Sequence, residues 1–150
     1  MSRSGTFEYT IEAPCDAATA VALLGDPRRN GELHPLIQSV DEVSPQPGAI
    51  ASYRITDLLP LGSLRFRIVY EADVITVTPS QVVTVARQRP GTSVRNETRV
   101  ATTEAGVVIT VAITMKAPTL LFGYAFRTAR AAHLELGERI ARRLTELATS

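Results

Sequence analysis

Residues 118–147 read PTLLFGYAFRTARAAHLELGERIARRLTEL, and this stretch decides how the rest of the chain must be arranged. Its apolar side chains recur at steps of three and four, which predicts one amphipathic helix from about Leu120 to Leu147, roughly 40 Å long. The stripe along this helix consists of Phe122, Phe126, Ala129, His133, Leu136, Ile140, Leu144 and Leu147. Because the sequence predicts no second long helix, this stripe has to lie against the apolar face of a sheet.

The segment before the long helix is expected to form mainly strands. Two short helices interrupt it early, one through Leu24 with Asp16 as its N-cap and one over residues 28–33. Turns rich in Pro and Gly separate the later strands by two to five residues, so neighbouring strands should pair in antiparallel fashion. The expected strands cover residues 7–12, 40–43, 50–58, 64–77, 82–88, 93–102 and 107–116.

This order of elements predicts an α+β fold formed by a single domain over residues 1–150. Seven strands should make one curved antiparallel sheet that wraps around the long C-terminal helix, with the two short helices after the first strand. Gly137 lies within the predicted long helix, where glycine costs about 1 kcal/mol relative to alanine. A close approach to the sheet, a bend over a cavity or an accident on the solvent side would each explain this glycine.

Composition excludes several classes of function. The chain has 150 residues, of which 45% are hydrophobic and 21% charged, with a formal net charge of +1, as is typical of a globular domain. No long run of basic residues favours nucleic-acid binding. The single cysteine, Cys15, excludes an intramolecular disulfide, and the longest apolar run, residues 107–115, is too short for a membrane helix. Without the pattern of a signal peptide, a cytoplasmic location is expected.

Alternation along the strands predicts which side chains face the helix. The interior should be mostly apolar, with a few polar groups among the inward-facing residues, which is typical of a small-molecule pocket. Buried groups of these types are also often satisfied by one another or by the backbone, so both interpretations stay open. The candidate ligand-binding residues on the strands are Tyr53, Phe66, Tyr70, Asn96 and Thr98, and Asp57 is a further interior polar residue.

The remaining candidates lie on the long helix and in the loop before the sheet. Phe122, Phe126, Ala129 and His133 belong to the helix stripe, and His133 either contacts a ligand or is a satisfied core histidine. His34, which precedes Pro35, either lies beside the mouth of the pocket or has a structural role in its loop.

These two histidines are the only ones, and no acidic residue lies at ligand spacing from either, so no metal site is expected. No cofactor motif and no recognisable catalytic set are present either.

Three short segments give the sequence a family resemblance. Ile11-Glu12-Ala13-Pro14 leads into the first helix, Gly25-Asp26-Pro27 closes it, and Leu33-His34-Pro35-Leu36-Ile37 follows. Together with the final amphipathic helix, these segments resemble the START-like superfamily (SRPBCC), which includes lipid-transfer domains, pollen-allergen-like proteins and polyketide cyclase/dehydrase-like proteins. The resemblance implies the helix-grip fold and a space between sheet and helix that holds lipids, sterols, polyketides or other apolar molecules.

Three functions remain possible at this stage. The first is binding of a small hydrophobic ligand, such as a lipid, sterol or polyketide, in a cavity between the sheet and the long helix. The second is an enzyme similar to polyketide cyclases and aromatases, and the third is a protein-interaction module with a filled interior. The first predicts a cavity of ligand size with its mouth near His34 and Phe122, in a protein that is a monomer or a homodimer.

Overall fold

The structure is a computed structural model that describes residues 1–149. Its seven strands form one antiparallel sheet in the order β1-β7-β6-β5-β4-β3-β2, so the meander expected from the sequence is confirmed. The elements are β1 (Ser2–Ala13), α1 (Ala17–Leu24), α2 (Pro27–Gly31), β2 (Ile37–Val43), β3 (Ala51–Leu61), β4 (Leu64–Thr78), β5 (Gln81–Gln88), β6 (Thr92–Thr103), β7 (Gly106–Pro118) and α3 (Thr119–Thr149).

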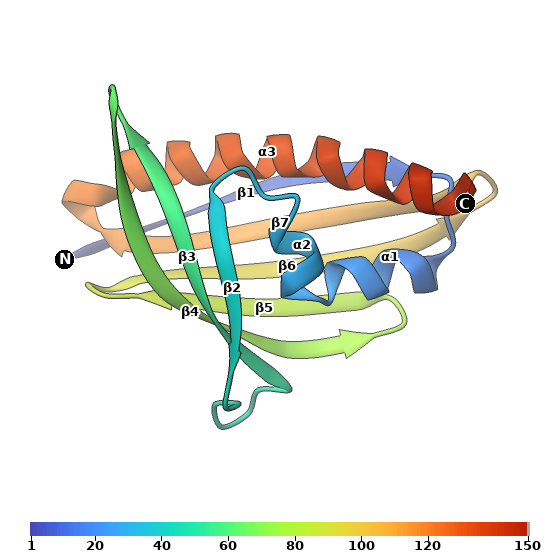
Figure 1. The fold of residues 1–150 in the computed structure, drawn as a ribbon, viewed down its shortest axis with the longest axis horizontal. Coiled ribbons are helices and arrows are strands. Elements are labelled where there is room, and N and C mark those ends of the chain that lie inside the picture. The colour runs from blue at the N-terminus through green and yellow to red at the C-terminus, as the bar shows by residue number, and fades with distance from the viewer. Residues whose placement is uncertain (150) are drawn as a thin grey trace.

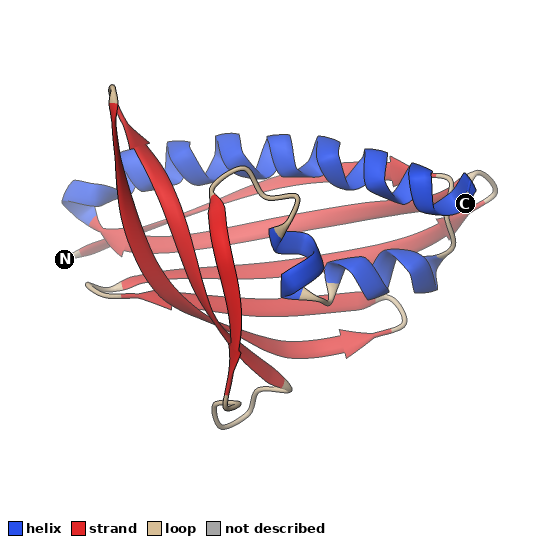
Figure 2. Ribbon diagram, viewed as in Figure 1, coloured by secondary structure: helices blue, strands red, loops and turns tan. Residues whose placement is uncertain are grey.

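The sheet curves around the long helix, as the helix-grip fold requires. Figure 1 shows α3 running along β1 and β7, while β2, β3 and β4 cross in front of the other strands at a steep angle. Register shifts in β4, between Val74 and Thr76, and in β2, between Ile37 and Ser39, occur in the strands that bend away. The two short helices lie on the concave side near the C-terminal half of α3 (Figure 2). The sheet therefore encloses space on the side of α3 that faces away from β1.

The ends of the elements follow from the residue types found there. The carboxylate of Asp16 accepts a hydrogen bond from the backbone N–H of Thr19, which confirms it as the N-cap of α1. Gly106, in the turn between β6 and β7, has a φ of 142°. A Cβ at this position would lie 2.1 Å from the Ala13 carbonyl oxygen, so no other residue fits the turn without a shift of the chain.

Two glycines allow α3 and β1 to approach each other closely. A Cβ on Gly137 of α3 would lie 3.0 Å from the Tyr9 ring, so this glycine marks a close approach to the sheet. On the strand side, a Cβ on Gly5 would lie 2.8 Å from the Phe122 ring and 3.0 Å from the Phe126 ring. Helix and strand therefore fit together because each leaves out a side chain where the other places an aromatic ring.

The main core lies between α3, β1 and β7. Leu136, Ile140 and Leu144 of the helix are buried against Ile109 and Ile113 of β7 and their neighbours. Among the described residues, no helix combines the length and apolar character needed to cross a lipid bilayer.

Shortening Ile140 tests this packing. Ile140 is 1% exposed, so Ile140→Ala should lower the free energy of unfolding by about 2–5 kcal/mol, because it leaves a void under α3. Leu134→Ala, at a position on the same helix that is 40% exposed, is the control and should have a much smaller effect. Denaturant unfolding measures both. A melting temperature of Ile140→Ala within one or two degrees of the parent would contradict this assignment of the buried face.

Candidate functional site

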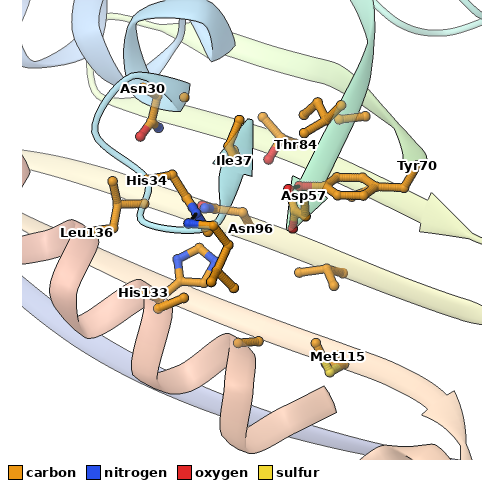
Figure 3. Close-up of a pocket in the computed structure, with 18 of the residues that line it drawn as sticks. Asn30, His34, Ile37, Asp57, Tyr70, Thr84, Asn96, Met115, His133 and Leu136 are labelled. Carbon is orange, nitrogen blue, oxygen red and sulfur yellow. Dashed lines mark hydrogen bonds between the residues drawn. The ribbon is translucent and has the colours of Figure 1, made fainter. Parts of the chain in front are cut away.

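A cavity of about 360 Å³ lies between the curved sheet and α3. Apolar side chains from β3, β4, β6, β7 and α3 make up most of its wall, and a smaller number of polar groups face it. On α3 its wall includes the small residues Ala125, Ala129 and Ala132. The loop after α2 closes one side, where His34 lies above α3 (Figure 3).

The exposed part of the wall lies where the β3–β4 hairpin meets the start of α3. Phe66 and Leu121 line the cavity and are 38% and 49% exposed. Tyr124 joins the two elements, because its ring lies 6.5 Å from the Phe66 ring and its hydroxyl donates a hydrogen bond to the Pro60 carbonyl oxygen. We therefore place the mouth between this hairpin and the first turns of α3.

Two histidines and a tyrosine form a cluster on the wall of the cavity. The backbone N–H of Leu36 donates to Nδ1 of His34 at 3.1 Å, so the neutral His34 ring carries its proton on Nε2. The His34 and His133 rings meet edge to face with centroids 5.6 Å apart, and Nδ1 of His133 lies 3.1 Å from the Tyr9 hydroxyl. The cluster thus joins the α2–β2 loop, α3 and β1.

Burial keeps both imidazoles neutral at physiological pH. Loss of hydration lowers the pKa of His34 to about 3 and that of His133 to about 4, and for His34 the charge states of His133 and Arg139 add to the shift. Neutral rings in these positions can donate or accept a hydrogen bond but bring no charge. Acidification from pH 6.5 downward should therefore cost stability, because the unfolded chain binds these protons more readily.

Asp57 and Tyr70 form a second polar pair in the cavity. The Tyr70 hydroxyl donates to Oδ1 of Asp57 at 3.2 Å (Figure 3). Burial raises the pKa of Asp57 to about 6, although the hydrogen bond from Tyr70 acts in the opposite direction. The pKa of the Tyr70 hydroxyl is raised by its own burial and by the nearby carboxylate. At neutral pH the pair is thus a largely ionised carboxylate beside a neutral phenol.

Asn96 and Asn30 are two further polar residues of the wall. The Thr98 hydroxyl donates to Oδ1 of Asn96 at 2.7 Å, which leaves the Asn96 amide N–H groups free to donate to a ligand. In the α2 segment, Oδ1 of Asn30 is buried and has no hydrogen-bond partner within residues 1–149. Buried amide oxygens are rarely left without a donor, so this atom marks a place where a ligand group or water would be stabilised.

Seven of the ten candidate residues from the sequence line this cavity: His34, Phe66, Tyr70, Asn96, Thr98, Ala129 and His133. Tyr53, Phe122 and Phe126 do not, and their predicted placement is corrected. Tyr53 packs into a small cluster with Ile55, Ala72 and Val74 at the β2–β3–β4 end of the sheet. Phe122 and Phe126 stack on each other, with centroids 5.2 Å apart, and fill the space over Gly5 of β1.

The same packing shows that the mouth of the cavity does not lie beside Phe122, where the sequence predicted it. Phe122 is only 5% exposed and lies against Met115 and Ala117, away from the opening.

Sequence reasoning missed several polar residues of the wall and ranked Asp57 too low. Tyr9, Tyr124 and Asn30 line the cavity but were not candidates, and Asp57 was considered an interior residue without a role. The alternation of Phe7, Tyr9 and Ile11 contains the signal for Tyr9, because it places all three on the inner face. No comparable signal exists for Asn30, whose position depends on how α2 packs.

Among the described residues, no group of three or more His, Cys, Asp or Glu side chains is arranged to hold a metal ion. Cys15 is a buried free cysteine.

Comparison with known proteins identifies the fold. No protein-family model matches the sequence, and no curated protein matches it. Solved structures do match. The di-domain ARO/CYC StfQ from the steffimycin biosynthetic pathway is 14% identical with a TM-score of 0.74, over 95% of this chain and 51% of the StfQ chain, so this chain spans about half of StfQ.

Two further structures align over most of both chains. Norcoclaurine synthase from Thalictrum flavum, in complex with dopamine and hydroxybenzaldehyde, is 12% identical with a TM-score of 0.66, over 97% of this chain and 88% of that one. Ara h 8.0201 is 16% identical with a TM-score of 0.60, over 92% and 98%. At these identities the likeness establishes the fold alone, and this is the helix-grip fold that the resemblance in the sequence implies.

Asp57→Asn tests the electrostatics of the cavity. Because the pKa of Asp57 is raised in the folded state, its ionisation costs stability above pH 6 and costs nothing below its ordinary pKa near 4. Asp57→Asn should therefore increase the free energy of unfolding at pH 8 by up to about 3 kcal/mol and change it little at pH 4.

Thermal melts at the two pH values measure the effect, which should be a rise of up to roughly 10 °C at pH 8. Asp41→Asn, at an exposed position on β2, is the control and should behave like the parent at both pH values. Equal melting temperatures of Asp57→Asn and the parent at pH 8 would show that Asp57 is not buried as described.

Proposed function

We propose that this protein binds a small, mainly apolar organic molecule in the cavity between the sheet and α3. One observation carries the proposal: an open volume of about 360 Å³, which lies within the usual range for ligand pockets, has a mostly apolar wall with a few converging polar groups. An apolar space of this size would be costly to leave empty, because the side chains around it lose contacts with neighbouring atoms.

The neighbours in fold support a ligand of this kind. The norcoclaurine synthase structure contains dopamine and hydroxybenzaldehyde, two small aromatic molecules, and StfQ is described as an ARO/CYC protein of a biosynthetic pathway. We extend to this chain only the class of ligand, a small and largely apolar molecule. The third possibility considered above, a protein-interaction module, assumed a filled interior, and the open cavity removes that assumption.

A specific observation also favours a second function, a cyclase-like enzyme. Asp57 faces the cavity beside the Tyr70 hydroxyl, and its pKa of about 6 would let it exchange a proton with a ligand near neutral pH. In ring closure by condensation, a common step is the removal of a proton by a carboxylate from the carbon next to a carbonyl group. Conversion of a bound poly-ketone by the parent, but not by Asp57→Asn, would distinguish this function from simple binding.

Ala129→Trp tests the binding site. Ala129 lines the cavity, and a tryptophan there would occupy much of its volume, so an uncharged apolar dye should bind the parent and lose at least about tenfold in affinity in the variant. Ala131→Trp is the matched control, because Ala131 lies two residues away on the exposed side of α3 and should leave the affinity unchanged. Fluorescence titration measures the affinity, and a thermal melt checks folding. Unchanged dye affinity in a folded Ala129→Trp variant would place the binding site elsewhere.

A further inference from the structure

Asp57 is the one carboxylate among the described residues that lines the cavity. It lies on β3 and is 7% exposed, with Ile37 of β2 and Ile68 of β4 as its partners across the sheet. Its hydrogen bond from Tyr70 engages one carboxylate oxygen, and within residues 1–149 no other donor reaches the carboxylate. A buried carboxylate with a single neutral donor is incompletely stabilised, because an ionised group of this kind usually has a charged partner or several donors.

The protein itself supplies no cation for Asp57. Arg87 is the other charged residue of the wall, and its guanidinium pairs with Asp73. Asp73 leaves β4 on the face opposite to Tyr70 and also accepts a hydrogen bond from Ser52, so the ion pair holds the Arg87 guanidinium on that opposite face. In the described part of the chain no salt bridge reaches Asp57, and the two nearby imidazoles are neutral.

A second acceptor of the wall without a donor lies on α2. Oδ1 of Asn30 is buried without a donor, whereas the Tyr9 hydroxyl and His133 are engaged with each other. In Figure 3, Asn30 and Asp57 lie at different sides of the same space, with His34 between them. A ligand that satisfies Asp57 and Asn30 therefore has to bring hydrogen-bond donors, and at Asp57 a donor with positive charge would be stabilised most.

We infer that the ligand is a small apolar amine, aromatic or alicyclic, and that Asp57 binds its protonated nitrogen while Tyr70 holds the carboxylate in place. This inference rests on the proposed function, since it assumes that the cavity binds an apolar molecule. The opposite charges attract more strongly in this largely apolar space than in water, which offsets the loss of hydration of both groups. An alcohol of the same shape gains only a neutral hydrogen bond to the carboxylate, and an acid is repelled.

Three ligands of equal skeleton test the inference. Phenylbutylamine, phenylbutanol and phenylbutyrate compete with the uncharged dye N-phenylnaphthylamine at about pH 7.5, where the amine is protonated. In the parent, the amine should displace the dye at a concentration about tenfold or more below that of the alcohol, and the acid should be weakest. In Asp57→Asn, whose dye affinity is measured separately, amine and alcohol should displace the dye at similar concentrations, whereas the control Asp41→Asn should keep the preference for the amine.

The outcomes separate this inference from the proposed function. If the dye binds and Ala129→Trp blocks its binding, but alcohol and amine displace it from the parent equally well, the inference of an amine ligand is wrong. The proposal of an apolar binding pocket then still stands. A preference for the amine that persists in Asp57→Asn also overturns the inference, because the charge would then be recognised elsewhere. If the dye does not bind the parent at all, the proposed function itself fails.

Discussion

The close contact between α3 and β1 is the constraint on which the rest of the structure depends. Gly137 lets the helix backbone approach the Tyr9 ring, and Gly5 leaves room for the rings of Phe122 and Phe126. The helix is therefore held against one edge of a seven-stranded sheet. Because a single helix is narrower than such a sheet, the strands from β6 to β2 curve away from it (Figure 1), and the cavity lies between them and the helix. The cavity is a direct consequence of this one-sided contact.

The polar groups of the cavity obey the same constraint. Polar groups that lie close to α3 and β1 pair with each other, as Tyr9 and His133 do. The loss of water around His133 favours its neutral ring. Those on the far side have fewer neighbours, and Asp57 there has only Tyr70 as a partner. The polar groups of the cavity therefore differ in how completely they are satisfied, and Asp57 and Asn30 are the least satisfied. The side of the cavity that the protein leaves incomplete is the side on which a ligand would contribute most.

The sequence predicted the fold almost completely, because period-two alternation and turn residues report directly on strands and their inner faces. The alternation correctly placed Tyr70, Asn96 and Thr98 on the inner face. The predicted placement of a buried side chain failed where two different neighbours could bury it. Tyr53 faces inward but lies beyond the cavity, under β2, and Phe122 belongs to the apolar stripe but faces β1. A stripe in one sequence shows that a side chain is buried without showing which of two neighbours buries it.

The stripe of α3 in fact has two flanks that differ in size. The flank over β1 carries the large rings of Phe122 and Phe126, whereas the flank over the cavity includes three small residues, Ala125, Ala129 and Ala132. Large residues close the contact to the sheet, and small residues on the other flank leave the volume open. If leucines replaced these alanines, the same backbone would have a filled core, since each added side chain would occupy space that now remains free. The one-sided contact of α3 with the sheet and the small residues that α3 places in the cavity wall together keep the interior open.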